Sequence, residues 1–172
     1  MKPFTLAFLL LAPLVPGAAG AQAGTDLFAL SGEWRGTGAI VTEPGKPGRE
    51  GRCRLRATPL VEGREIRLKG RCATDQGSAE LSMRFVLYED GVLAGGIATS
   101  GQSETVQYGG RLEDGTARLS SRESVLVGDM RATSNIALTI ADENSFRLRQ
   151  WLTPEDGTPP VAMVEMDFTR AP

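Results

Sequence analysis

Residues 51–72 read GRCRLRATPLVEGREIRLKGRC, and this stretch decides how the chain can fold. Apolar and polar residues alternate on both sides of Glu62-Gly63, a pattern typical of two antiparallel strands joined by a tight turn. With the turn at this step, Cys53 falls directly opposite Cys72, at a cross-strand distance that suits a disulfide. The cysteine spacing and the turn position are independent observations that give the same register. The sequence therefore predicts a β-hairpin closed by a Cys53–Cys72 disulfide.

The opposite face of this hairpin is strongly basic. It carries six cations, four of them in facing pairs: Arg52, Arg54, Arg56, Arg67, Lys69 and Arg71. Facing like charges destabilise a ladder, and unpaired cations are costly to bury. We therefore expect this face to point outward, either screened by solvent and neighbouring acids or covered by an anionic partner. The alternative is a partly wet lumen in which an inward Arg pair holds a ligand carboxylate.

Strand-like alternation recurs along the chain with a turn signal about every ten residues. An acidic residue beside a glycine marks several of these turns, as at Glu62-Gly63 and Asp156-Gly157. The expected strands are 33–42, 50–61, 64–73, 78–88, 92–99, 104–112, 116–126, 131–141, 145–152 and 161–170. Helix-period segments are missing apart from a short turn around 26–30. This rhythm predicts an all-β fold, an antiparallel up-and-down β-barrel of about ten strands, whose closure removes exposed strand edges.

The N-terminus has the pattern of a secretory signal peptide. A short apolar run follows Lys2, and AQA at 21–23 supplies the A-x-A site that signal peptidase reads. We expect residues 1–23 to be removed and residues 24–172 to form a single exported domain, periplasmic or extracellular. An N-terminal membrane anchor is the alternative, which Pro13 disfavours because it interrupts the run. The oxidising compartment agrees with a disulfide.

The composition narrows the function classes. A net charge of −2 argues against general nucleic-acid binding, and no later segment is apolar enough for stable membrane insertion. The chain contains no His, so we expect no metal site. Glu165 and Asp167 share a strand face and could act together in a lumen, but we expect them on the solvent face. No G-x-S-x-G nucleophile motif is present, and the protein is expected not to be an enzyme.

The first expected strand resembles a known family. Gly32-Glu33-Trp34 is similar to the G-x-W that opens the first strand of calycins, the superfamily of lipocalins and fatty-acid-binding proteins. In calycins an Arg near the end of the last strand covers this Trp at the closed end of the barrel, and Arg170 matches that role by position. The longer piece GEWRGTG at 32–38 resembles the start of nitrobindin-type haem-binding barrels. That family holds haem iron through a His, which this chain lacks, so no cofactor is expected.

The resemblance implies a lumen that binds a small hydrophobic or amphipathic molecule and does not catalyse a reaction. The cations of this chain extend the expected ligands to anionic ones. The candidate ligand-binding residues are the following: Trp34, Arg54, Arg56, Arg67, Arg147 and Arg149. Cys53, Cys72 and Arg170 are expected to be structural. For Trp34, core packing is the competing interpretation, because a large aromatic on a first strand is usually buried. The alternative function is an envelope or periplasmic interaction or structural protein that uses the basic hairpin face.

Overall fold

The computed structural model describes residues 26–101 and 104–172, which contain eleven β-strands and two short 3-10 helices. The strands are β1 (Gly32–Ile40), β2 (Arg49–Val61), β3 (Glu65–Thr74), β4 (Gly77–Leu87), β5 (Val92–Thr99), β6 (Val106–Glu113), β7 (Thr116–Ser121), β8 (Val125–Val127), β9 (Met130–Asp142), β10 (Ser145–Pro154) and β11 (Val161–Arg170). The helices are η1 (Leu27–Ala29) and η2 (Glu89–Gly91). No helix in this described part of the chain is long and apolar enough to cross a membrane. The signal peptide expected over 1–23 lies outside the described residues.

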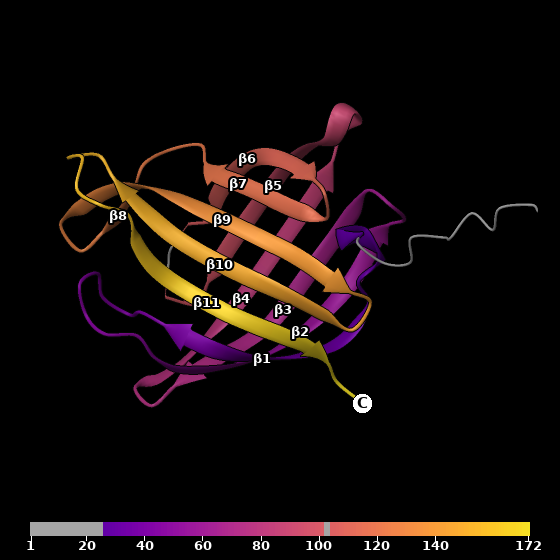
Figure 1. Cartoon of the computed structure of the whole chain (residues 1–172), viewed down its shortest axis with the longest axis horizontal. Helices are drawn as coiled ribbons and strands as arrows, with labels where there is room; N and C mark the ends of the chain where they lie inside the picture. The colour runs from indigo at the N-terminus through magenta and orange to yellow at the C-terminus, as the bar shows by residue number, and fades with distance from the viewer. Residues whose placement is uncertain (1–25, 102–103) are drawn as a thin grey trace, which may run out of the picture.

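Ten of the strands close into a barrel (Figure 1). β1 to β7 follow one another as antiparallel neighbours, β7 pairs with β9, and β9 pairs with β10. β11 pairs with both β10 and β1, which joins the last strand to the first. Every barrel strand thereby has a partner on each side, and closure protects the strand edges. The expected all-β, antiparallel up-and-down barrel of about ten strands is confirmed.

The expected single strand 116–126 is wrong, because the structure divides it into β7 and β8. β9 is 13 residues long, and the ladder between β7 and β9 ends where Ser120 lies opposite Asn135. The chain leaves this ladder over 122–124 and returns as β8, which pairs with the first residues of β9. Gly128 turns the chain between β8 and β9 at a positive φ of 60°. β8 is therefore an extra strand beside the closed ring.

The hairpin of β2 and β3 has the predicted register. Cys53 lies opposite Cys72, and Arg54 lies opposite Arg71. The two cysteines form a disulfide with a Cα–Cα distance of 4.0 Å, which confirms the predicted bond. Gly63 occupies the turn with a positive φ of 65°, a conformation that glycine adopts without strain.

Two glycines allow neighbouring strands to approach unusually closely. A Cβ atom added at Gly70 of β3 would overlap the carbonyl oxygen of Arg54 on β2. A Cβ at Gly38 of β1 would overlap the carbonyl oxygen of Glu165 on β11 in the same way. Glycines at such positions let strands bend around a small barrel, and they are part of the reason that this sheet closes.

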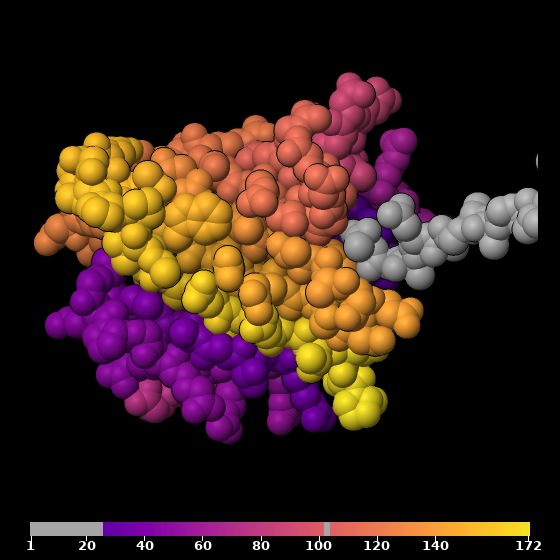
Figure 2. Space-filling model, viewed as in Figure 1, coloured from indigo at the N-terminus to yellow at the C-terminus, as the bar shows by residue number. Residues whose placement is uncertain are grey.

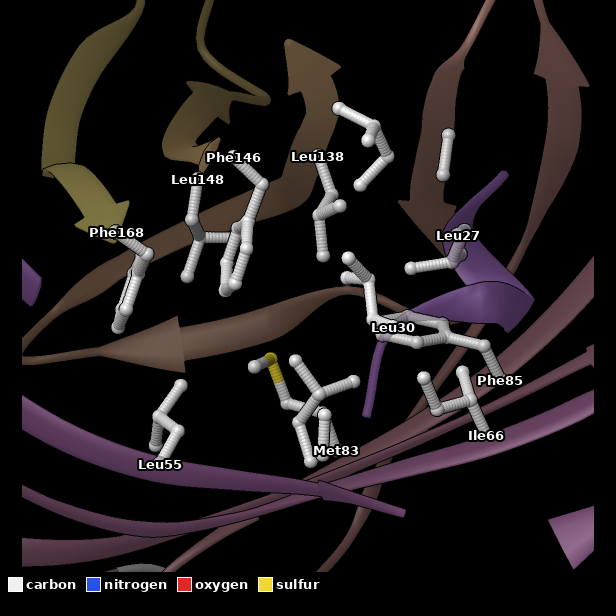
Figure 3. Packing of buried hydrophobic residues seen from close by; sticks show 14 of the residues in the cluster. Leu27, Leu30, Leu55, Ile66, Met83, Phe85, Leu138, Phe146, Leu148 and Phe168 are labelled. Carbon is white, nitrogen blue, oxygen red and sulfur yellow. The ribbon is translucent and has the colours of Figure 1, made fainter. Parts of the chain in front are cut away.

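The interior of the barrel is filled by alternate residues of each strand. In β2, for example, Cys53, Leu55 and Ala57 are buried while Arg54 and Arg56 between them are exposed. Figure 3 shows how side chains from opposite walls meet, with Leu138 above and Met83 and Phe85 below. A one-residue slip in register would exchange the two faces, so burial of the apolar face fixes the pairing.

One end of the barrel is closed by the segment that precedes β1. Asp26 begins η1 by accepting a hydrogen bond from the backbone N–H of Phe28, at 2.9 Å. The side chains of Leu27, Phe28 and Leu30 are at most 2% exposed. Figure 3 shows Leu27 and Leu30 entering the core beside Ile66 and Phe85. The short turn expected around 26–30 is thus an apolar plug.

Arg170 covers the first-strand tryptophan at this closed end. Its guanidinium carbon lies 4.8 Å from the centre of the Trp34 ring, within cation–π range. The same guanidinium donates hydrogen bonds to the backbone carbonyls of Ser31 (2.6 Å) and Glu143 (2.8 Å). Trp34 also packs edge-on against Phe146, with ring centres 4.9 Å apart. Arg170 therefore ties β11, the segment before β1 and the β9–β10 turn together, the arrangement that the calycin resemblance implies.

The disulfide provides the first test of this fold. Replacing Cys53 and Cys72 together by Ala should lower the free energy of unfolding by about 3 kcal/mol, because the 20-residue loop is then free in the unfolded chain. Denaturant unfolding of the variant, of the oxidised protein and of the reduced protein measures the difference. Reduced protein should match the variant closely. Equal stability of all three, or thiol labelling of the native oxidised protein, would contradict the assignment.

Arg170→Ala should destabilise the protein by about 2 kcal/mol, since it removes a cation–π contact and charge-assisted hydrogen bonds to two carbonyls. Arg149→Ala is the matched control, because Arg149 is a half-exposed arginine in a surface ion pair with Glu165. Its effect on the free energy of unfolding should be much smaller. If the two variants lose the same stability, Arg170 does not hold the closed end together.

Candidate functional site

The two ends of the barrel differ. η1 closes one end, whereas the other end carries the longer connections, including those over 41–48, 122–129 and 155–160. Figure 1 shows this second end on the left, with the loop after β1 and the β10–β11 loop projecting from it. We call this second end the mouth. A site inside the barrel has to be reached from the mouth, because η1 blocks the opposite end.

An apolar cavity of about 160 Å³ lies in the lumen toward the mouth. Its walls come from eight of the barrel strands. The apolar residues that line it are Ile40, Cys53, Cys72, Ala79, Leu81, Met83, Ile97, Ile136, Leu148, Val164, Met166 and Phe168, and the polar ones are Glu80, Thr99 and Gln150. Met83, Leu148 and Phe168 line the cavity and also belong to the packed core, where Figure 3 shows them. The disulfide therefore forms part of the cavity wall in addition to bracing the hairpin.

The volume of the cavity limits what it can hold. Sites for drug-sized ligands and cofactors measure about 300–1,000 Å³, so a haem group does not fit here. An apolar cavity of about 150 Å³ accepts a benzene-sized molecule. The cavity of this barrel thus suits a small ring or the end of an alkyl chain.

A buried polar network borders the cavity. The hydroxyl groups of Tyr108 and Ser134 are 2.9 Å apart, and the amide of Gln150 donates to the Ser134 hydroxyl oxygen at 3.0 Å. Tyr108 and Ser134 are each 2% exposed. Gln150 also lines the cavity, and its carbonyl oxygen accepts no hydrogen bond from the described residues. Gln150 can therefore accept a hydrogen bond from a ligand while its N–H₂ group stays anchored.

Tyr108 is neutral at ordinary pH. Burial raises the pKa of its phenol above the usual value, and the hydrogen bond with Ser134 acts in the opposite direction without cancelling that effect. The network therefore consists of neutral hydroxyl and amide groups, which can orient a polar ligand group but carry no charge.

The arginines proposed from the sequence lie away from this cavity. All five are exposed on the outer surface of the barrel: Arg54, Arg56, Arg67, Arg147 and Arg149. The outward orientation expected for the basic stripe is therefore observed, and the alternative of an inward Arg pair is not. Trp34 is 1% exposed at the closed end, among Phe146 and Arg170, and does not line the cavity.

The outer arginines of β10 are neutralised by the neighbouring strand. Arg147 pairs with Asp167 at 2.5 Å and Arg149 pairs with Glu165 at 3.4 Å. The hydrogen bond with Asp167 raises the pKa of Arg147 above its ordinary value. Glu165 and Asp167 thus lie on the solvent face, as expected, and take no part in the lumen. Figure 2 shows the side chains of β10, β11 and β1 as adjacent bands across this face.

The surface around the β2–β3 hairpin is far more cationic. The name cationic face is used below for one set of outward side chains, those of Arg35, Arg54, Arg56, Arg67, Lys69, Arg71 and Arg84. Arg35, Arg54 and Arg71 lie side by side on three consecutive strands. Only three of its seven cations have a carboxylate partner: Arg56 with Glu33, Arg71 with Glu80, and Arg84 with Glu65. The other four form no ion pair with any described residue.

Sequence reasoning missed several of these residues. Arg35 and Arg84 are each next to a buried residue, Trp34 and Phe85, so the alternation along the strand predicts that both side chains point outward. Their position beside the hairpin depends on the order of strands in the sheet, which the alternation does not give. Gln150 follows Phe146 and Leu148 at inward positions of β10, and a Gln at such a position is a sequence signal of a polar interior.

The described residues contain no group of three or more His, Cys, Asp or Glu side chains that could hold a metal ion. No protein-family model matches the sequence, and a search of curated proteins found no significant match. The function proposed below therefore stands on the geometry of this chain.

The raised pKa of Tyr108 gives a pH test of the buried network. An unfolded tyrosine ionises near pH 10. Above that pH the unfolded chain loses this proton while the folded protein keeps it, so the free energy of unfolding should fall until the pH passes the folded pKa. Denaturant unfolding of the wild type and of Tyr108→Phe between about pH 9 and 11 measures the effect. The decline should be steeper in the wild type, and identical slopes would place Tyr108 in solvent contact.

Proposed function

We propose that this protein is an exported, non-enzymatic binding protein that takes the apolar end of a small amphipathic molecule into its lumen through the mouth. The observation that carries the proposal is the apolar cavity of about 160 Å³ between the packed core and the mouth. It is bordered by a single anchored amide with a free acceptor, that of Gln150. The ligand is therefore an alkyl chain or small ring with a polar group.

The energetics favour an amphipathic ligand over a purely apolar one. A phenyl-sized group buries about 150 Å² of surface, worth about 4 kcal/mol at about 25 cal/mol per Å². That alone corresponds to a dissociation constant of about 1 mM. A tighter complex needs contacts beyond the cavity, which a polar head group at the mouth or a hydrogen bond to Gln150 would supply.

A binding role fits the chemistry of the cavity better than catalysis does. The polar side chains that line the cavity are those of Glu80, Thr99 and Gln150, and the Glu80 carboxylate is held in an exposed ion pair with Arg71. The neutral hydroxyls of Ser134 and Tyr108 extend the hydrogen-bond network from Gln150. The cysteine sulfurs are joined in a disulfide and are not nucleophilic thiolates. The carboxylates of Glu165 and Asp167 face solvent in ion pairs.

Export and a calycin relationship are parts of the same proposal. The Cys53–Cys72 disulfide is compatible with an oxidising compartment, which agrees with the A-x-A site at 21–23. The contact between Arg170 and Trp34 at the closed end, in a closed antiparallel barrel, supports a calycin-type origin.

A series of n-alkanols tests the cavity directly. Each added methylene that enters the cavity should tighten binding about fourfold, since it contributes about 0.8 kcal/mol, until the cavity is full and the gain stops. Calorimetry or ligand-observed NMR on the mature protein measures this. Ile97→Phe and Val164→Phe fill the cavity and should abolish the chain-length dependence.

Ala162→Phe is the matched control, because Ala162 is exposed on β11 and its replacement adds a phenyl group outside the lumen. Thermal unfolding establishes that each variant is folded before binding is compared. Affinity that does not change with alkanol length, or that survives both cavity-filling replacements, would overturn the proposed function.

A further inference from the structure

A second concave surface lies on the outside of the barrel. It is a groove of about 830 Å³ across β3, β4, β5 and β6. Its floor consists of the outward residues of β5, Ala94, Gly96 and Ala98, which have almost no side chains. Longer side chains on the flanking strands rise above this floor. From Ala94 to Ser100 the groove follows β5 for about 20 Å.

One wall of the groove is cationic. Arg67 lies opposite Arg84, and Arg84 lies opposite Gly96 of the floor. Lys69 is next to Ser82, which in turn lies opposite Ala98. Arg67 and Lys69 form no ion pair or side-chain hydrogen bond with the described residues. The groove is therefore the concave edge of the cationic face.

The repulsion between Arg67 and Arg84 is offset only in part by the described residues. Directly opposed like charges destabilise a strand pair. Glu65 pairs with Arg84 and raises its pKa, so it stabilises only one of the two. A bound anion would neutralise both, which makes the wall suited to an anionic partner.

The remaining lining is mostly neutral and offers groups that sugars use. Its one carboxylate, that of Glu80, is paired with Arg71 outside the groove. Tyr88 is 58% exposed at one end of the groove and offers an aromatic face. Ser82, Thr105 and Gln107 supply hydroxyl and amide groups along the walls. The flat Ala-Gly-Ala floor allows a ring to approach the backbone closely.

We propose that this groove binds a segment of an acidic polysaccharide, with carboxylate or sulfate groups on Arg67, Lys69 and Arg84. Sugar hydroxyls pair with Ser82, Thr105 and Gln107, and one ring stacks on Tyr88. The groove length of about 20 Å accommodates a short run of sugar units in an extended chain. This binding surface opens on the outside of the barrel and is distinct from the lumen, although Glu80, Leu81 and Thr99 line both hollows.

An acidic peptide fits the groove less well. Both sides of β5 are already paired, with β4 and with β6, so a peptide cannot add as a strand. Its backbone N–H and C=O groups would find only a few side chains as partners, and unpaired buried peptide groups are costly. A lipid headgroup surface is flat and cannot follow a hollow between two raised walls.

Binding of defined polymers to the mature protein tests the proposal. The probes are polygalacturonate and dextran sulfate, with neutral dextran, poly-glutamate and phosphatidylglycerol vesicles for comparison. Calorimetry or affinity electrophoresis near physiological salt measures each affinity. Polygalacturonate, dextran sulfate or both should bind, and neutral dextran should not. Binding to poly-glutamate or to the vesicles that equals or exceeds the polysaccharide affinity would overturn the proposal in favour of a protein segment or a lipid surface.

Two kinds of variant locate the site. Replacing Arg67, Lys69 and Arg84 together by Gln should weaken polysaccharide binding at least about tenfold, because three surface charges that contact the polymer are removed. The charge-matched control replaces Lys46, Arg118 and Arg131 by Gln, exposed cations that lie away from the groove. The control should retain affinity within about twofold. Equal losses in both triple variants would show a non-specific charge effect and overturn the site.

Ala98→Trp tests the groove without changing charge. The indole would occupy the floor and should also weaken binding about tenfold or more. Ala141→Trp on the outer face of β9 is its control and should bind like the wild type. Unchanged binding by Ala98→Trp would show that the polymer contacts cationic side chains but does not enter the groove, which contradicts the proposal.

Discussion

The register of the β2–β3 hairpin is the constraint on which the rest of the structure depends. The disulfide holds Cys53 opposite Cys72, and all other pairs of the hairpin follow from that one. Because side chains alternate between the faces of a strand, this register sends the sulfurs and Leu55 inward and the arginines outward. A slip of one residue would bury at least four cations. The cavity wall and the cationic face are thus two consequences of a single pairing.

The interior is divided along the barrel axis by what closes each end. At one end η1 inserts Leu27 and Leu30, and Arg170 joins the first and last strands over Trp34. The side chains at this end are buried and packed against one another. The space that remains lies toward the mouth, where the longer connections lie. A packed closed end opposite an accessible mouth is the arrangement expected of a ligand-binding barrel.

The sequence predicted the local parts of this structure well. The hairpin register, the disulfide and nine of the ten proposed strands depend on alternation and turn residues that are near in sequence. The break between β7 and β8 was not predictable, because it arises from which part of β9 each segment meets. The cavity was not predictable either, since Ile97, Gln150 and Val164 meet only when β5, β10 and β11 face one another across the closed barrel.

β5 separates the two proposed surfaces and contributes to both. Ile97 faces the cavity, while Gly96 and Ala98 beside it form the floor of the outer groove. The two surfaces meet along β4 and β5, but they use different types of interaction. Burial of an alkyl chain in the cavity is driven by the hydrophobic effect, which moderate salt hardly changes. Binding in the groove depends on exposed charges, which salt screens over a Debye length of about 8 Å at physiological ionic strength. Salt concentration therefore acts on the outer groove and leaves the lumen unaffected, although only one strand lies between them.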